Sequence, residues 1–416
     1  MNMENRADAV VIGGGIIGSM AALYLLRSGR AVKIIEREHV AAGASAGNAG
    51  ILAFPEIVPI PAPGVTFKAP GWLMDPLGPL AIRPAYAPKL APWFWNFTRA
   101  STRRYFERSL GVQKALMKLS VEEYEKLRVE PSLSPFIDNT GTLDLYDSAT
   151  TFKAAAEDWA HKKAAGFEFH RVGRAEIEEL QPGLAPEFQH AIYSEAGLQV
   201  NDPAAFTQAV AALAEQEGAT ILKGEATALE AMENGARIRL ADGTTIEAAT
   251  VVVACGAWSK RLAASLGERV LLDTERGYNT TLPAAAFDIR RQLYFNDHSF
   301  VVTPLKDRIR VGGAVEFGGL ELKPNFKRSD ALMKLATRFL PGLKAEGGEQ
   351  WMGFRPSMPD CLPVIDRSKK APAVLYAFGH GHLGLTQSAA TGRIVAELAG
   401  NTPPSTDLAN LRFDRF

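Results

Sequence analysis

The feature that most constrains this chain lies near its start, where an apolar run leads into a turn of closely spaced glycines. The run Ala9-Val10-Val11-Ile12 is continuous and rich in β-branched residues, which predicts a buried strand. The turn Gly13-Gly14-Gly15-Ile16-Ile17-Gly18 follows it directly, and we expect an apolar helix from there to Leu26. This order of strand, glycine turn and helix is typical of a site that binds a dinucleotide.

Each glycine at the motif spacing has a separate physical role. Gly13 permits the backbone to bend, Gly15 lets a pyrophosphate approach the main chain, and Gly18 lets the helix pack closely on the strand. The first N–H groups of the helix, at Ile16 and Ile17, have no partner within the helix and can bind the phosphates.

An acidic residue lies where such a site requires one. The next expected strand, residues 32–36, ends in Glu36, about 18 residues beyond Gly18. A carboxylate there would bind a ribose hydroxyl. The alternative is a glycine turn in an unrelated α/β domain. Such a turn would not require the apolar strand before it, the apolar helix after it or the acidic residue at the end of the next strand.

The composition is that of a globular protein with no general affinity for polyanions. Of the 416 residues, 47% are hydrophobic and 22% are charged, and 46 Lys and Arg balance 46 Asp and Glu. The length allows two or three domains, and the charge balance gives no case for nucleic acid or for general adhesion to an anionic membrane. The only cysteines, Cys255 and Cys361, predict neither disulfides nor a metal site. The expectation is small-molecule chemistry in a reducing cytoplasm.

Residues 9–26 carry no charge and are the one candidate for a membrane span or a signal peptide. The glycine turn interrupts this stretch, and no cleavage site follows a basic leader. We therefore interpret it as a buried strand and helix.

Two further stretches of the first hundred residues are informative. Residues 37–50 are small and flexible, and with Ser45 and Asn48 as hydrogen-bond donors they suit a loop pressed against a ligand, the alternative being an ordinary surface loop. Residues 55–92 are rich in proline, which predicts an irregular excursion without helix or central strand. It ends at Trp93, where aromatic residues precede several arginines. That cluster indicates either a membrane-interface patch or the start of a helix packed on the core.

The remaining chain alternates between helical and strand patterns. Helices are expected at 112–129, 154–165, 175–180, 206–216, 329–339 and 386–398, with Asp202 as the cap of the fourth. Strands are expected at 140–146, 191–193, 219–222, 238–240 and 249–254, and several short strands between 275 and 317 predict a separate antiparallel sheet.

A second glycine-rich turn lies near the other end of the chain. Residues 375–378 are strand-like, and Gly379-His380-Gly381-His382-Leu383-Gly384 leads into the last expected helix. Bare N–H groups at that helix start favour a developing negative charge. The first turn alone would fit NAD, whereas two such turns fit one extended cofactor held at both ends. A flavin benefits most, because its reduced ring is anionic.

Six segments in this order resemble the D-amino-acid oxidase superfamily of flavoproteins, and most closely its bacterial D-amino-acid dehydrogenase branch, which includes D-hydroxyproline dehydrogenases. They are VVIGGGIIGSMAALYLLRSGRAVKIIER, ASAGNAG, WLMDPLGPLAIRP, VVVACGAWS, WMGFRPSMPD and GHGHLGLTQSAATG, and the resemblance runs from about Asp8 to Ala399. It implies FAD and the oxidation of a D-amino acid, such as D-proline or hydroxy-D-proline, to an imino acid that hydrolyses to a 2-oxo acid.

The resemblance also implies a fold and a set of cofactor residues. The fold is α/β: a Rossmann-like FAD-binding domain (1–60, 200–270 and 350–416) interleaved with an α+β substrate domain (61–199 and 271–349) built on an antiparallel sheet. The residues expected at FAD are Gly13, Gly15, Ile16, Ile17, Gly18, Glu36, Arg37, Ser45, Asn48, Ala49, Gly50, Ala254, Gly256, Gly379, Gly381, His382, Leu383, Gly384, Leu385 and Thr386. Some relatives attach FAD through a cysteine near the position of Arg355, and neither cysteine lies there, so we expect non-covalent FAD.

Three residues are candidates for contact with the substrate. By its motif, Arg355 would pair with the substrate carboxylate, and a guanidinium suits that task because it forms two parallel hydrogen bonds; the alternative is an ion pair with Asp360 or Asp366. Tyr278 would line the substrate wall or simply pack in a hairpin. His382 would contact the ring or substrate, or be an ordinary loop histidine.

The function expected is FAD-dependent oxidation of a D-amino acid by hydride transfer. The alternatives are a sarcosine- or glycine-type secondary amine oxidase and a non-catalytic flavoprotein subunit. The electron acceptor would be a quinone, an electron-transfer protein or oxygen. We expect a cytoplasmic protein, with peripheral contact to the inner face of the cell membrane as a further possibility.

Overall fold

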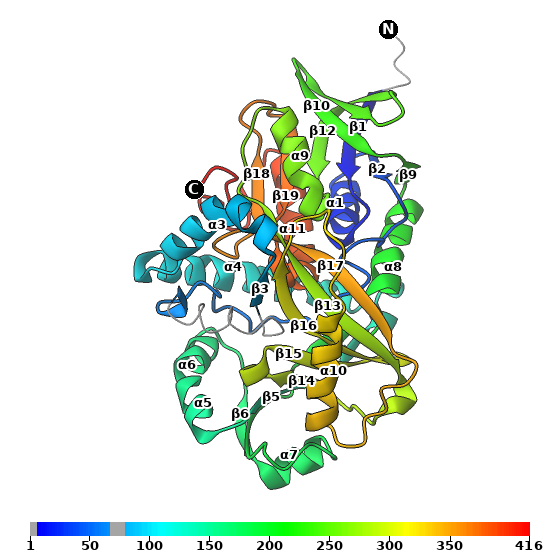
Figure 1. Cartoon of the computed structure of the whole chain (residues 1–416). Coiled ribbons are helices and arrows are strands. Elements are labelled where there is room, and N and C mark those ends of the chain that lie inside the picture. Colours follow the sequence, from blue (N-terminus) through cyan, green and yellow to red (C-terminus); the bar gives the residue numbers. More distant parts are fainter. Residues whose placement is uncertain (1–5, 67–79) are drawn as a thin grey trace.

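The computed structural model describes residues 6–66 and 80–416, which build two β-sheets arranged end to end with helices around them (Figure 1). The first sheet has a parallel centre in the order β9 (Thr220–Lys223), β2 (Val32–Glu36), β1 (Arg6–Ile12), β12 (Thr245–Val253) and β19 (Val374–Phe378). Antiparallel strands continue it as β10 (Ala226–Met232) and β11 (Gly235–Leu240) beside β12, and β18 (Val364–Arg367) beside β19.

Helices cover the parallel strands because their apolar faces need burial. α1 (Ile16–Arg27), α8 (Pro203–Gln216), α11 (Gly384–Ala399) and α4 (Arg103–Leu127) contribute to one buried cluster. As expected, Asp202 caps α8, accepting a hydrogen bond from Ala205 N at 3.1 Å. α9 (Ser259–Ser265) lies beside β10.

The second sheet is almost entirely antiparallel, as the sequence predicts. Its order is β17 (Glu349–Ser357), β13 (Asp273–Pro283), β16 (Arg308–Phe317), β15 (Phe300–Leu305), β14 (Gln292–Phe295), β5 (Thr142–Tyr146), β7 (His190–Ser194) and β6 (His170–Gly173). A short strand, β3 (Leu80–Ile82), pairs with β16, and β4 (Ile137–Asn139) pairs with β8 (Leu198–Val200) separately.

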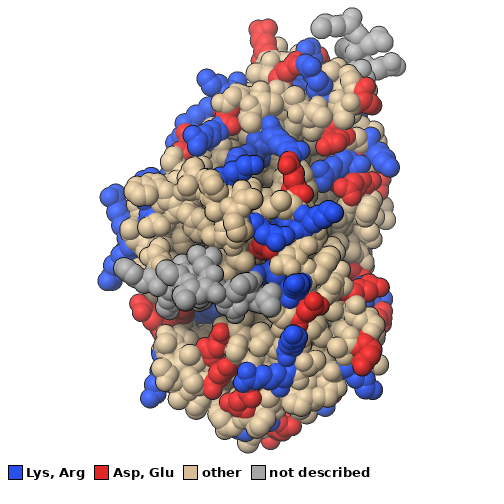
Figure 2. All heavy atoms as spheres, viewed as in Figure 1, with Lys and Arg blue, Asp and Glu red and all other residues tan. Residues whose placement is uncertain are grey.

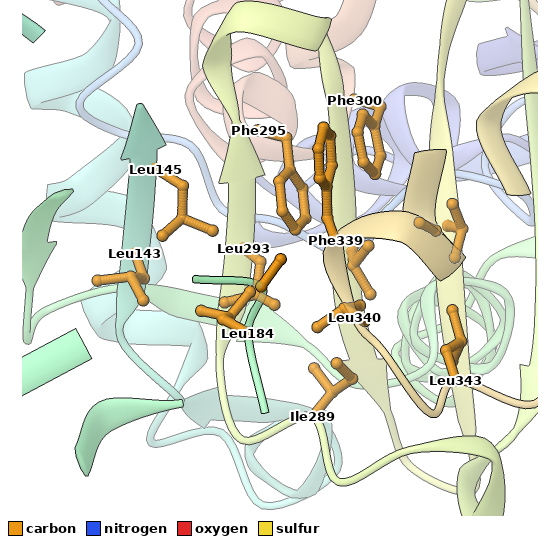
Figure 3. Packing of buried hydrophobic residues seen from close by; sticks show 14 of the residues in the cluster. Leu143, Leu145, Leu184, Ile289, Leu293, Phe295, Phe300, Phe339, Leu340 and Leu343 are labelled. Carbon is orange, nitrogen blue, oxygen red and sulfur yellow. The ribbon is translucent and has the colours of Figure 1, made fainter. Parts of the chain in front are cut away.

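An aromatic stack fills the core under this sheet. The rings of Phe295 and Phe300 lie 4.5 Å apart and nearly parallel, and Phe339, at the end of α10 (Lys327–Phe339), stacks on Phe295 at 5.4 Å (Figure 3). Leucines of β5 and β14 continue the same cluster. The α/β fold with a Rossmann-like part and an antiparallel part is therefore confirmed.

The proline-rich excursion departs from prediction at its end. Leu80–Ile82 is a strand and α3 (Ala87–Ala100) is a helix, so the expectation of no helix up to Pro92 was wrong. Pro88 lies in the first turn, where N–H groups have no helical partner, whereas Pro92 lies inside the helix and removes one of its hydrogen bonds. Residues 67–79 of the excursion lie outside the described part of the chain.

The aromatic cluster at the end of the excursion packs on the core. The Trp93 side chain is buried, stacks on Phe97 at 5.5 Å, contacts Phe317 at 5.0 Å and donates from Nε1 to Ser357 O at 3.2 Å. The next tryptophan, Trp95, points outward and is 69% exposed. The core interpretation thus holds for Trp93.

Other boundaries shift. α4 begins at Arg103, nine residues before the predicted start at Val112, and the helix expected at 154–165 is divided at Ala155 into α5 (Ala149–Ala154) and α6 (Ala156–Ala164). The acidic helix is α7 (Arg174–Leu180). β17 pairs with β13, so residues 350–357, assigned by prediction to the FAD-binding domain, belong by pairing to the second sheet.

Candidate active site

A large cavity, here called the main cavity, lies where the carboxyl ends of β1, β2 and β12 face the second sheet. Its volume is about 1100 Å³, and residues of both sheets line it. Ligands of open α/β sheets bind at the carboxyl ends of the strands, so the position is the one that the glycine motif predicts.

The first glycine turn is shaped by close backbone contacts. Gly13 has a φ of 110°, and a Cβ there would lie 2.5 Å from Ala254 O. A Cβ on Gly18 would lie 1.9 Å from Gly13 O, which is why the helix can approach the strand so closely. Gly15 precedes the first turn of α1 and lines the cavity with Gly13. The first turn of α1 therefore faces the cavity, but Ile16 N already donates to Ser45 Oγ at 2.9 Å, so the expectation that this N–H is free for a phosphate was wrong.

Glu36 ends β2 beside this turn. Its Oε2 accepts a hydrogen bond from Gly14 N at 2.7 Å and its Oε1 one from Glu38 N at 2.9 Å. The next residue, Arg37, lies over the Trp258 ring at 4.1 Å from its centroid. Both Glu36 and Arg37 line the cavity, next to the turn that would hold the phosphates.

The loop of residues 37–50 lies against the cavity, but its polar side chains mostly hold the loop itself. Ser45 Oγ accepts from Ile16 N at 2.9 Å, and Asn48 bonds to Ser45 O and Gly50 N. Two side chains of the second sheet fix its other side: Asn279 donates to Gly47 O at 2.8 Å, and Arg310 donates to the carbonyls of Ala46 and Asn48. The loop is thus a bridge between the sheets.

The second glycine turn forms the opposite end of the cavity. A short helix, η7 (Gly381–Leu383), leads directly into α11. Gly381, His382, Gly384 and Leu385 line the cavity. Leu383 instead packs in a buried cluster, and Thr386 Oγ1 accepts from Ala53 N at 3.0 Å. Contact of those two with a cofactor would have to come from the main chain.

His380 lies inside this turn. Its Nε2 lies 2.9 Å from Thr391 Oγ1, and its Nδ1 has no partner among the described residues. Burial lowers the pKa of His380 to about 3, so its ring is neutral at physiological pH.

Arg355 reaches the main cavity from β17. Its Nη1 donates to Ala314 O at 3.0 Å, and its guanidinium lies across Gly277 on the neighbouring strand, where a Cβ would be 2.5 Å from Nη2. Burial lowers the pKa of Arg355, and the charge of Glu275, its partner in the strand pairing, opposes this.

The structural alternative for Arg355 does not occur. Asp360 pairs with Arg415 at 2.8 Å, and Asp366 accepts from Phe413 N at 3.2 Å. Within residues 6–66 and 80–416, Arg355 has no ion pair, and Glu275 is the only carboxylate that influences its pKa. A half-buried guanidinium that lines the cavity and has one hydrogen-bond partner among the described residues, Ala314 O, is suited to bind an anionic ligand.

The other two candidates for substrate contact, Tyr278 and His382, differ in whether their polar atoms already have hydrogen-bond partners among the described residues. The hydroxyl of Tyr278 donates to Glu316 at 3.1 Å and accepts from Asn325 N at 3.0 Å, so it packs within the sheet while part of its side chain lines the cavity. His382 lines the cavity with an accessible ring. The surrounding cavity walls desolvate the ring and lower its pKa; the charge of Glu56 raises the pKa and that of Arg355 lowers it, with a net lowering.

Most predicted cofactor residues line the main cavity. They are Gly13, Gly15, Ile16, Ile17, Glu36, Arg37, Ser45, Asn48, Ala49, Ala254, Gly256, Gly381, His382, Gly384 and Leu385. Gly18, Gly50 and Gly379 lie behind the lining, where a Cβ on each would meet Gly13 O, Val200 O and Met358 Cγ respectively. Their role is to permit close packing.

Sequence reasoning missed several polar residues of the lining. The most informative are Glu56, Glu275, Tyr294, Asn296 and Arg310. Glu56 lies in the proline-rich excursion, and the others lie on or beside strands whose neighbours are distant in sequence. Only the spacing of Glu275 and Gly277, which share a strand face, offered a signal.

The fold and this cavity define a flavoprotein oxidoreductase. The chain belongs to the FAD dependent oxidoreductase family, whose model matches residues 8–398. It is 34% identical to a D-amino-acid oxidase of Bradyrhizobium diazoefficiens over 100% of both chains, and 30% identical to a D-amino acid dehydrogenase of Rhizobium johnstonii over 98% of this chain and 99% of that protein.

Solved structures share the fold at lower identity. Glycine oxidase from Geobacillus kaustophilus superposes with a TM-score of 0.77 at 22% identity, covering 99% of each chain. L-proline dehydrogenase from P. horikoshii gives 0.73 at 20% identity, covering 96% of this chain and 94% of the other. At these identities the likeness concerns the fold alone.

The predicted family, FAD as cofactor and enzymatic activity are therefore confirmed. The cavity fits FAD, because close-packed glycines, two helix starts and Glu36 occupy the ends of one continuous space. Non-covalent attachment stays a prediction. In the described residues no group of His, Cys, Asp and Glu could hold a metal ion, and no helix there has the length and apolar character needed to cross a membrane.

One glycine of the substrate end allows a direct test of the geometry. Gly277→Ala would place a methyl group 2.5 Å from the Arg355 guanidinium and force it aside. We expect kcat/KM for the substrate to fall at least about tenfold, equivalent to about 1.4 kcal/mol, mainly through KM. Steady-state kinetics with the FAD absorption as a check measures this. Gly173→Ala, with no atom within 4 Å of its Cβ and outside the lining of both cavities, is the matched control, and equal kinetics for both variants would contradict the geometry.

Proposed function

We propose that the enzyme oxidises a D-amino acid to an imino acid, which water hydrolyses to a 2-oxo acid and ammonia. The observation that supports this most is the position of Arg355, a half-buried guanidinium without an ion pair among the described residues, in the cavity that fits FAD. The names of the two relatives, a D-amino-acid oxidase and a D-amino acid dehydrogenase, point the same way.

In this proposal the residues of the second sheet orient the substrate. Arg355 binds the substrate carboxylate through two parallel hydrogen bonds; its hydrogen bond to Ala314 O orients the guanidinium, and the charge of Glu275 favours its ionised form. Tyr278 contributes wall surface and no proton, because its hydroxyl is already bonded on both sides.

The substrate amine must lose a proton before its lone pair can form the C=N bond. His382 is the proposed acceptor, since its lowered pKa keeps the ring neutral at pH 7 and its side chain is accessible in the cavity. FAD, when bound, supplies at N5 the acceptor for the hydride that leaves Cα. The helix starts at the two glycine turns favour negative charge on the cofactor.

Anaerobic mixing tests the proposal. The panel is D-alanine, D-proline, cis-4-hydroxy-D-proline, L-alanine, sarcosine and glycine, and the readout is loss of the oxidised flavin absorption. We expect bleaching by at least one D-amino acid at a rate at least tenfold above that with its L enantiomer, sarcosine or glycine. Faster bleaching by sarcosine or glycine would favour the amine oxidase alternative, and no bleaching by any member would overturn the proposal.

The electron acceptor and location are also proposals. We propose a cytoplasmic enzyme that passes electrons to a quinone, an electron-transfer protein or oxygen, with peripheral membrane contact through exposed Trp95 beside Arg99 and Arg103. On the face shown in Figure 2, basic and acidic side chains are interspersed. Turnover with oxygen, a quinone and a dye separates the acceptors, and co-sedimentation of the protein and Trp95→Ala with anionic vesicles tests the contact.

A further inference from the structure

A second cavity opens beside the main one. Its volume is about 320 Å³, and it shares Glu56, Ile60 and Asn296 with the main cavity. We call it the side cavity. Because shared residues form the boundary, a ligand anchored in the main cavity can extend into it.

The charged groups of the side cavity do not balance. Glu56, Asp144 and Asp158 line it, and the only basic residue among its described lining is Lys162. Lys162 Nζ donates to Glu56 Oε1 at 2.8 Å and lies 4.3 Å from the centre of the Trp159 ring. This lysine is therefore committed to Glu56.

Asp144 is the most deeply buried carboxylate of this group. It is 94% buried, with a relative exposure of 6%. Its Oδ1 accepts from Asn296 Nδ2 at 3.2 Å, and within residues 6–66 and 80–416 its Oδ2 has no hydrogen-bond donor. A buried carboxylate is costly unless a cation or several donors compensate it.

We propose that the side cavity binds the cationic side chain of the substrate, with Asp144 as its principal partner, so that basic D-amino acids such as D-lysine are preferred. This rests on the proposed function, because Arg355 must hold the α-carboxylate for the side chain to point toward Glu56. A side-chain ammonium would supply the donors that Asp144 Oδ2 and Glu56 Oε2 lack. Asn296, at the boundary, orients Asp144.

The electrostatics give the preference a pH dependence. Burial raises the pKa of Asp144 to about 6; Lys162 and the Asn296 hydrogen bond lower it, and Glu56 raises it. Tyr146 and Tyr294 also face this group, and their pKa values lie far above neutrality. Asp144 is thus ionised above about pH 6, and the preference for a cation is lost as the pH falls through that value.

The test compares D-lysine with D-norleucine, which has the same four-carbon side chain but carries hydrogen in place of the terminal ammonium. The readout is the ratio of their kcat/KM values, measured with a dye acceptor on the FAD-loaded enzyme. We expect a ratio of at least ten at pH 7.5 that decreases below pH 6. In Asp144→Asn, which keeps the acceptor for Asn296, the ratio should fall at least tenfold and lose its pH dependence.

Asp307→Asn is the matched control, because it removes the same charge from an exposed aspartate that lines neither cavity. Its ratio should change less than threefold. A ratio near one in the unaltered enzyme, or the same ratio in Asp144→Asn, would overturn the inference. If D-norleucine and D-alanine are oxidised with kcat/KM values as high as that of D-lysine, only this inference fails. If no D-amino acid bleaches the flavin, the proposed function itself fails.

Discussion

Arg355→Leu is expected to lower kcat/KM for D-amino acids by about 30-fold to several thousand-fold, while the protein remains yellow. Removing one partner of a buried charge pair costs roughly 2–5 kcal/mol, and every 1.4 kcal/mol is about tenfold. The FAD ends of the cavity lie on other elements, so cofactor binding should persist. Stopped-flow reduction, which measures substrate binding and flavin reduction separately, is the appropriate measurement.

Two further variants sharpen this result. Arg355→Lys keeps the charge but cannot form two parallel hydrogen bonds, so it should fall between the unaltered enzyme and the leucine variant. Arg104→Leu removes an exposed arginine and should change kcat/KM less than threefold. If Arg355→Leu turned over D-amino acids normally, the carboxylate would have to be bound elsewhere.

Gly18→Ala is expected to give a colourless protein. The new Cβ would lie 1.9 Å from Gly13 O, and since both partners are backbone, α1 must move away from the turn that holds the phosphates. We expect the Kd for FAD to rise at least about tenfold, and the free energy of unfolding of the apoprotein to fall by about 1–3 kcal/mol, as for other overpacked sites. Fluorescence titration with FAD and urea unfolding measure the two effects.

Gly111→Ala provides the comparison. Gly111 lies in α4 with no atom within 4 Å of its Cβ, so alanine should stabilise that helix by roughly 0.5–1 kcal/mol and leave FAD binding unchanged. Normal FAD affinity in Gly18→Ala would show that α1 tolerates displacement and that the tight turn is not needed for the cofactor.

The parts of the site predicted from sequence are those that depend on local rules. The strand, glycine turn and helix around Gly13 follow from spacing alone, as does the second turn before α11, and both lie at the main cavity. The antiparallel sheet was evident from its short strands. Asp202 was recognised because a cap acts on its own helix.

The remaining features depend on contacts between distant segments. Nothing near Glu275 in sequence shows that it lies opposite Arg355 in the pairing of β13 with β17. Likewise, Glu56 and Lys162 form an ion pair although they are 106 residues apart in sequence. The part of α3 before Trp93 was missed because its prolines outweighed the apolar spacing that buries Leu90 and Trp93. Here tertiary packing on Phe317 overrode the local propensity.

The order in which the chain supplies its two sheets limits how such an enzyme can be recombined. β1 and β2 belong to the first sheet, β5 to β7 to the second, β9 to β12 to the first, β13 to β17 to the second, and β18 and β19 to the first. Transplanting residues 273–357 from a relative would move Arg355 and Glu275 but leave Asp144 and Lys162 behind. A chimaera with a new substrate range therefore needs the segment of β5 to β7 and the segment of β13 to β17 from the same donor.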